Sequence, residues 1–124
     1  MTSLQIARDF LADVQDALSN VDPAPTVTLS ATEALGILGD GQTVLVLDPP
    51  RQTFETYNLT ENELSLVAVA SAEDPIEGWE ELEEIVNTLR VPLALDSAEM
   101  TMWQGPSGSP WPAALMKTTI TTTD

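Results

Sequence analysis

Apolar side chains recur every three or four residues in two stretches of the chain. In the first stretch they are Leu4, Ala7, Leu11, Val14 and Leu18. In the second they are Ile76, Trp79, Leu82, Ile85, Val86 and Leu89. This spacing places the apolar residues on one face of a helix. It predicts amphipathic helices over residues 3–19 and 74–89, with Trp79 in the core.

Capping residues agree with these two helices. Thr2 or Ser3 can cap the first helix, and Asp74 followed by Pro75 is a favourable start for the second. Prolines between residues 22 and 25 end the first helix, and Pro92 stops the second, because proline lacks the amide donor that a helix needs. Both helices are therefore bounded by local chemistry as well as by their periodicity.

The other apolar segments predict strands and one short helix. Strands are expected at residues 26–29, 43–48, 52–60 and 64–71, and a helix of one or two turns is expected at 31–38. The strands at 52–60 and 64–71 predict a hairpin whose connection is Glu61-Asn62. A second hairpin is expected from strands 98–103 and 113–122, with a nine-residue loop at 104–112 rich in Gly, Pro and Ser.

This order of elements predicts an α+β fold. We expect an antiparallel or mixed β-sheet with the N-terminal and central amphipathic helices packed on one face. The 124 residues suit a single domain spanning 1–124.

The chain is strongly acidic, with 20 Asp and Glu against 4 Lys and Arg and a net charge of −16. Nucleic acids and anionic lipids need cationic side chains to neutralise their phosphates, so the charge disfavours such partners. No apolar run reaches the roughly 18 residues of a membrane span, so no membrane association is expected. The hydrophobic fraction of 43% nevertheless predicts a folded core.

Candidate catalytic chemistry is sparse. The chain has no histidine and no cysteine, which removes the commonest general base, metal ligand and thiol nucleophile. The acidic run within 77–84 is interpreted as a solvated helix face, and Asp48, Glu55 and Asp96 show no spacing that would make them a carboxylate site. We therefore expect no enzyme activity, no catalytic or metal-binding residues and no cofactor.

The whole order of segments resembles one known family. LVLDPP (45–50) is followed by TFETYNLTENELSLVAVAS (53–71), then by DPIEGWEELEEIVNTL (74–89) and by SPWPAALMKTTITT (109–122). In this respect the chain resembles the tail terminator proteins of long-tailed siphophages, over roughly residues 3–122.

The resemblance implies a virion structural protein rather than a catalyst. Such a protein forms a homohexameric ring that caps the completed tail tube, stops tube polymerisation and joins the tail to the head-completion proteins of the neck. It implies a location at the tail–neck junction of the virion, reached from the host cytoplasm during assembly. DNA would cross the ring without specific binding, helped by repulsion from acidic lumen residues.

Four residues are our predicted interface contacts: Arg51, Trp103, Gln104 and Trp111. Tryptophan is enriched at binding hot spots, yet Trp103 comes just before the predicted 104–112 loop and Trp111 lies near its end, so both can also pack within their own hairpin. Both interpretations stay open at this point. Other functions to weigh are a head–tail connector or stopper protein, an acidic DNA mimic that inhibits a nucleic-acid enzyme, and a small enzyme.

Overall fold

The computed structural model describes residues 2–21, 25–56, 59–71, 74–104 and 110–123. Within these ranges the chain forms three helices and six strands. In chain order they are α1 (Ser3–Ala17), β1 (Thr26–Thr28), α2 (Ala31–Gly39), β2 (Val44–Leu47), β3 (Arg51–Thr56), β4 (Leu59–Val69), α3 (Pro75–Arg90), β5 (Ser97–Gln104) and β6 (Pro110–Thr123).

The strands form one mixed sheet in the order β1-β2-β4-β6-β5. β1 pairs with β2 in parallel, and the other neighbours are antiparallel. β3 also pairs with β4, beyond the end of β2, so β2 and β3 lie one after the other along the same edge of β4. The predicted α+β class is confirmed.

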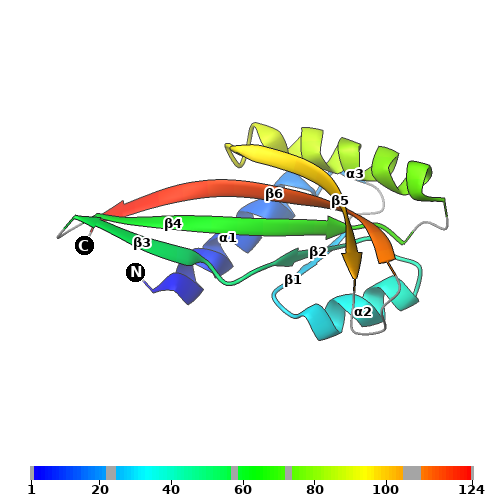
Figure 1. The fold of residues 1–124 in the computed structure, drawn as a ribbon, viewed down its shortest axis with the longest axis horizontal. Helices are drawn as coiled ribbons and strands as arrows, with labels where there is room; N and C mark the ends of the chain where they lie inside the picture. The colour runs from blue at the N-terminus through cyan, green and yellow to red at the C-terminus, as the bar shows by residue number, and fades with distance from the viewer. Residues whose placement is uncertain (1, 22–24, 57–58, 72–73, 105–109, 124) are drawn as a thin grey trace.

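The two amphipathic helices cover one face of the sheet, here called the helical face. Ile6, Phe10 and Val14 of α1 and Leu82 and Leu89 of α3 share one buried cluster with apolar side chains of the sheet. The strand members of that cluster are Val27, Leu45, Leu47, Leu64, Leu66, Ala68, Ala114 and Met116, and Ala70 just after β4 joins them. In Figure 1, α1 passes behind β4 and β6 while α3 runs along the upper edge.

The opposite face is only partly covered. Ala34 and Leu38 of α2 pack there against Val44, Val46 and Val69. α2 lies over one end of the sheet (Figure 1), whereas the rest of this face carries no helix among the described residues. We call the uncovered part the open face.

Local chemistry fixes the starts of the helices, and the caps at Thr2 and Asp74 are as predicted. The side chains of Thr2, Ser30 and Asp74 each accept a hydrogen bond from a backbone amide in the first turn of the following helix. Gly78 lets α3 approach β6, because a Cβ there would lie 2.8 Å from Cγ of Pro112. A larger residue would push the helix off the sheet.

The predicted hairpin connection at Glu61-Asn62 is wrong. β4 begins at Leu59, so both residues lie inside the strand, and residues 57–58 between the strands are outside the described ones. Asn62 is fully buried and donates through Nδ2 to the Ile120 carbonyl (3.0 Å) and to Thr122 Oγ1 (3.2 Å). Its side chain therefore joins β4 to β6 within the sheet and does not form a turn.

The predicted loop at 104–112 is also too long. Gln104 ends β5, and β6 already begins at Pro110, while residues 105–109 lie outside the described part. Prolines are tolerated at this end because β4 pairs with β6 only as far as Ala113, so no ladder donor is needed there. The Pro112 carbonyl instead accepts from the amide of Ala70 (3.0 Å).

The far end of the sheet forms a three-stranded arm. It consists of β3, residues 59–63 of β4 and residues 119–123 of β6. Figure 1 shows these strands tapering together at the left, away from α2 and α3.

Candidate interaction surfaces

Three of the four predicted contact residues come together at one end of the sheet. Trp103 of β5 lies directly across from Trp111 of β6, and Gln104 pairs with Pro110. Both tryptophans are half-buried and pack against the cluster under α2, whereas Gln104 is exposed. The tryptophans thus pack within their own hairpin, and their contact with a partner stays a prediction.

Trp111 carries an unusual feature. Its indole Nε1 is buried and has no hydrogen-bond partner among the described residues.

Arg51 lies in a different part of the molecule. It opens β3 in the arm, is exposed, and pairs across the strands with Glu63 of β4. The tryptophan pair belongs to β5 and the start of β6, on the opposite side of β4 from β3. The four predicted residues therefore do not form one site.

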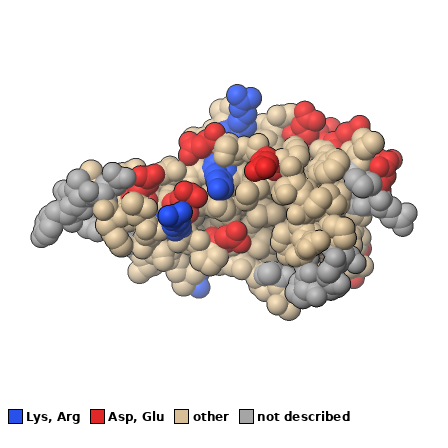
Figure 2. Space-filling model, in the orientation of Figure 1, with Lys and Arg blue, Asp and Glu red and all other residues tan. Residues whose placement is uncertain are grey.

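The open face carries charges of both signs. Lys117 Nζ of β6 lies 3.9 Å from Glu63 Oε1 of β4, and both side chains are about half exposed. In Figure 2, basic and acidic side chains alternate in the centre-left of the view, while acidic ones gather alone at the upper right, where Figure 1 shows α3. Exposed pairs of this kind contribute little stability, so this face depends on its backbone pairing.

β5 is the last strand in the sheet order and so forms one of its edges. Seven of its eight residues are exposed, including Met100 and Met102. These methionines lie opposite Ala114 and Pro112 of β6 and so project toward the helical face. Trp79 of α3 donates through Nε1 to the Thr101 carbonyl (3.3 Å), which covers the edge at one point. Trp79 packs against the core cluster, as predicted.

The acidic residues of α3 lie on its solvated face. Glu77, Glu80, Glu83 and Glu84 are exposed, and Glu81 accepts from the Thr43 hydroxyl (2.6 Å). Among the described residues, no group of three or more acidic side chains could hold a metal ion.

The three carboxylates weighed from the sequence do not meet. The Asp48 amide bonds to the carbonyl of Ser65 in β4, and the Asp96 amide bonds to that of Lys117 in β6. Ser65 and Lys117 are directly paired, so two strands separate the two aspartates by about 14 Å. The side chain of Glu55 lies outside the described ones.

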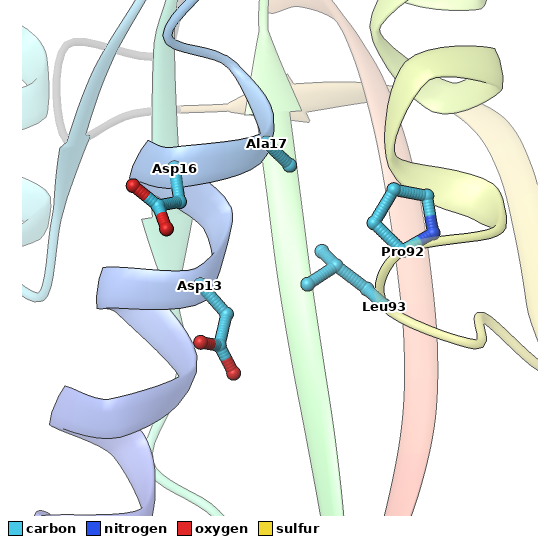
Figure 3. A pocket seen from close by; sticks show the side chains of 5 residues that line it. All are labelled: Asp13, Asp16, Ala17, Pro92 and Leu93. Carbon is cyan, nitrogen blue, oxygen red and sulfur yellow. The ribbon is translucent and has the colours of Figure 1, made fainter.

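Two shallow hollows flank α3. One, of about 430 Å³, lies between Asp13 and Asp16 of α1 and Pro92 and Leu93 after α3. Figure 3 shows the Leu93 side chain reaching toward α1 and the two carboxylates on successive turns. The other, of about 300 Å³, has Arg90 and Asp96 in its lining. Neither brings together groups for acid–base or nucleophilic catalysis.

An apolar groove was not foreseen from the sequence. Its volume is about 200 Å³, and it lies at the junction between β2 and β3. Its lining comes from α1, the end of β1 and the β2–β3 junction: Ser3, Leu4, Ala7, Leu29, Leu47, Pro49 and Pro50. These segments are far apart in the sequence, and only Pro49-Pro50 offered a signal, interpreted as a stiff strand exit.

Comparison with models of known protein families and with curated proteins found no match to this chain. Among the described residues, no helix is long and apolar enough to cross a membrane.

Proposed function

We propose that this chain is a virion structural protein that caps the completed tail tube of a long-tailed phage as a homohexameric ring. The ring stops tube polymerisation and joins the tail to the head-completion proteins of the neck. The proposal rests on the resemblance described above. The observation that supports it best is the exposed edge of β5 with its two exposed methionines.

A closed ring needs heterologous contacts, in which one surface of a subunit meets a different surface of the next. An exposed strand edge suits such a contact, because its free backbone groups can pair with an extended segment of the neighbour. Met100 and Met102 add apolar side chains beside that edge, and Gln104 and the tryptophan pair lie at its end.

The charge sets the conditions for assembly. Six copies at −16 repel one another, and salt screens that repulsion over about 10 Å at 0.1 M. Ring formation should therefore strengthen with salt or with a basic partner. The same charge gives acidic lumen residues a role, since DNA with about one charge per 1.7 Å would be repelled rather than held.

The decisive measurement is the mass of the purified chain by native mass spectrometry, across a salt series, with and without tail tube protein. We expect six copies, or a ring that forms only with tube protein. Met102→Glu should abolish the ring because it places a charge at the β5 edge. The matched control is Val91→Glu, which adds the same charge at a residue 83% exposed after α3 and should leave the ring intact.

One rival function has a specific observation in its favour. The exposed glutamates of α3 form an acidic helix face that a DNA mimic could present to a basic enzyme. A chain that ignores tube protein at every salt concentration and binds a basic nuclease would replace the terminator proposal with this one. A chain that binds neck proteins but not tube protein would indicate a connector or stopper.

A further inference from the structure

β2 and β3 lie along the same edge of β4, but only β2 has a further strand on its outer side among the described residues. β1 pairs with the outer edge of β2, at Val44, Leu45 and Val46. β3 continues along β4 where β2 ends, and within the described residues no strand pairs with its outer edge. A further strand, in line with β1, can therefore pair with the outer edge of β3.

The apolar groove lies at this junction of β2 and β3. Leu29 follows the last residue of β1, and Pro49 and Pro50 join β2 to β3, so the groove opens where a strand added to β3 would arrive. Leu4 and Leu29 in its lining are 50% and 41% exposed. The groove can accept one large apolar side chain from such a strand.

β3 itself carries a side chain of that kind. Phe54 is 75% exposed, although it is aromatic and lies within a paired strand. It is paired with Thr60, and Gln52 is paired with Asn62, whose buried side chain lies on the helical face. Phe54 thus projects to the same side of the sheet as Leu47 and α1, which line the groove.

We propose that two copies of this chain pair through β3, antiparallel, about a two-fold axis at Gln52, with Phe54 of each copy in the groove of the other. Antiparallel pairing about residue 52 sets residue 54 of one copy opposite residue 50 of the other. Directly opposed residues project to the same face of an antiparallel pair. Phe54 therefore arrives beside Pro50 of the partner subunit, at the mouth of the groove.

Charge on the open face favours the same arrangement. Within one copy, Arg51 lies across from Glu63, and Thr53 lies across from Glu61. The two-fold pairing sets Arg51 opposite Thr53 of the partner subunit, which gives the cross-strand order Glu63, Arg51, Thr53, Glu61. The arginine then lies between acidic side chains of both copies. In a chain with only 4 basic residues, this edge places an arginine of each copy among acidic side chains of both.

The pairing goes beyond the proposed function and does not depend on it. It uses the β3 edge and leaves the β5 edge, on the other side of the sheet, free for a ring. The dimer is tested by a disulfide at residue 52, whereas the ring is tested by the mass of the assembly with and without tube protein.

The test is a disulfide across the two-fold axis. The chain has no native cysteine, so Gln52→Cys introduces a single thiol at an exposed position. Opposed Cα atoms in antiparallel strands lie about 4.5–5.5 Å apart, within the range of about 4.4–6.8 Å that a disulfide spans. We expect Gln52→Cys to give a covalent dimer under mild oxidation. Thr101→Cys, at the exposed β5 edge, is the matched control and should give little covalent dimer, because β5 lies on the other side of the sheet from β3.

Two further substitutions test the Phe54 side chain and the groove that receives it. Phe54→Ser and Leu4→Asp, each combined with Gln52→Cys, should lower the dimer yield about tenfold, while Val91→Ser should not. A Gln52→Cys chain that stays monomeric would overturn the proposal. So would a mixed disulfide between Gln52→Cys and Thr101→Cys chains, since it would indicate pairing of β3 with β5. Loss of the dimer in Phe54→Ser with the tube-dependent ring retained would support the pairing and leave the proposed function standing.

Discussion

The two halves of β4 belong to one strand but are stabilised in different ways. From Leu64 to Val69, alternate side chains enter the cluster under α1 and α3 or the cluster under α2. From Leu59 to Glu63, in the arm, the inward positions are the polar Thr60 and Asn62. In both halves every second residue is buried, but only residues 64–69 bury apolar side chains.

This difference divides the sheet into two parts. The part around residues 64–69 of β4, here called the body, stabilises the fold, whereas the arm is exposed at its end. Apolar burial contributes about 25 cal/mol per Å², so the body of the sheet holds most of the stability. The arm is held by backbone pairing and by the hydrogen bonds of Asn62, each worth about 1 kcal/mol net. An arm of this kind can be altered at its surface without unfolding the body, which suits an element that contacts other copies.

The largest expected effect comes from a cavity in the body. Leu66→Ala, at a residue 1% exposed, should lower the free energy of unfolding by about 2–5 kcal/mol. Leu59→Ala, at a half-buried residue of the same strand in the arm, should cost less than about 1 kcal/mol. Urea denaturation of both variants measures the contrast. Equal losses would mean that body and arm are not distinct in stability.

A smaller effect is expected from the polar centre of the arm. Asn62→Ala removes the donor to the Ile120 carbonyl and to Thr122, and should cost about 1–3 kcal/mol. Amide hydrogen exchange should accelerate in β3 and in residues 119–123 but not in β2, because the opening is local. Gln52→Ala, which loses the part-buried bond to Asn62 Oδ1 and keeps both bonds donated by Asn62 Nδ2, is the control. Uniform acceleration across the sheet would contradict a separately held arm.

The body was predictable from sequence, and the arm was not. The stripes of α1 and α3 have a helical period, and their capping residues are local, so periodicity and caps sufficed to predict them. Glu61 and Asn62 look like turn residues because they are polar and consecutive. Their strand structure depends on Ile120 and Thr122, about 60 residues later, which no local pattern reveals.

The candidate surfaces show the same limit. Trp103 and Trp111 could be singled out by residue type, but their direct pairing and the buried Nε1 of Trp111 follow from hairpin register. The groove at Pro49-Pro50 needs α1 and the end of β1 to complete it. Surfaces assembled from distant segments carry no spacing signal in the chain.

A glycine in the body tests its packing from the helix side. Gly78→Ala would set a Cβ 2.8 Å from Pro112 Cγ and 3.0 Å from its Cβ, on a ring that cannot rotate away. Overpacking should cost about 1–3 kcal/mol in thermal or urea unfolding. Gly36→Ala in α2 is the matched control, because it has nothing within 4 Å and should gain about 0.5–1 kcal/mol from helix propensity. A neutral Gly78→Ala would show that α3 is not seated closely on β6.

The smallest effect is expected where the body meets the arm, at the pair of Lys117 and Glu63. Their charged atoms lie 3.9 Å apart and both side chains are about half exposed, so solvent screens most of the attraction. A double-mutant cycle with Lys117→Met and Glu63→Gln should give a coupling energy of about 0.2–1 kcal/mol that shrinks as salt is added. A coupling energy above that range that does not change with salt would mean that the charge pair holds the body and the arm together. The arm would then share its stability with the body, because the charge pair would bridge the two halves of β4.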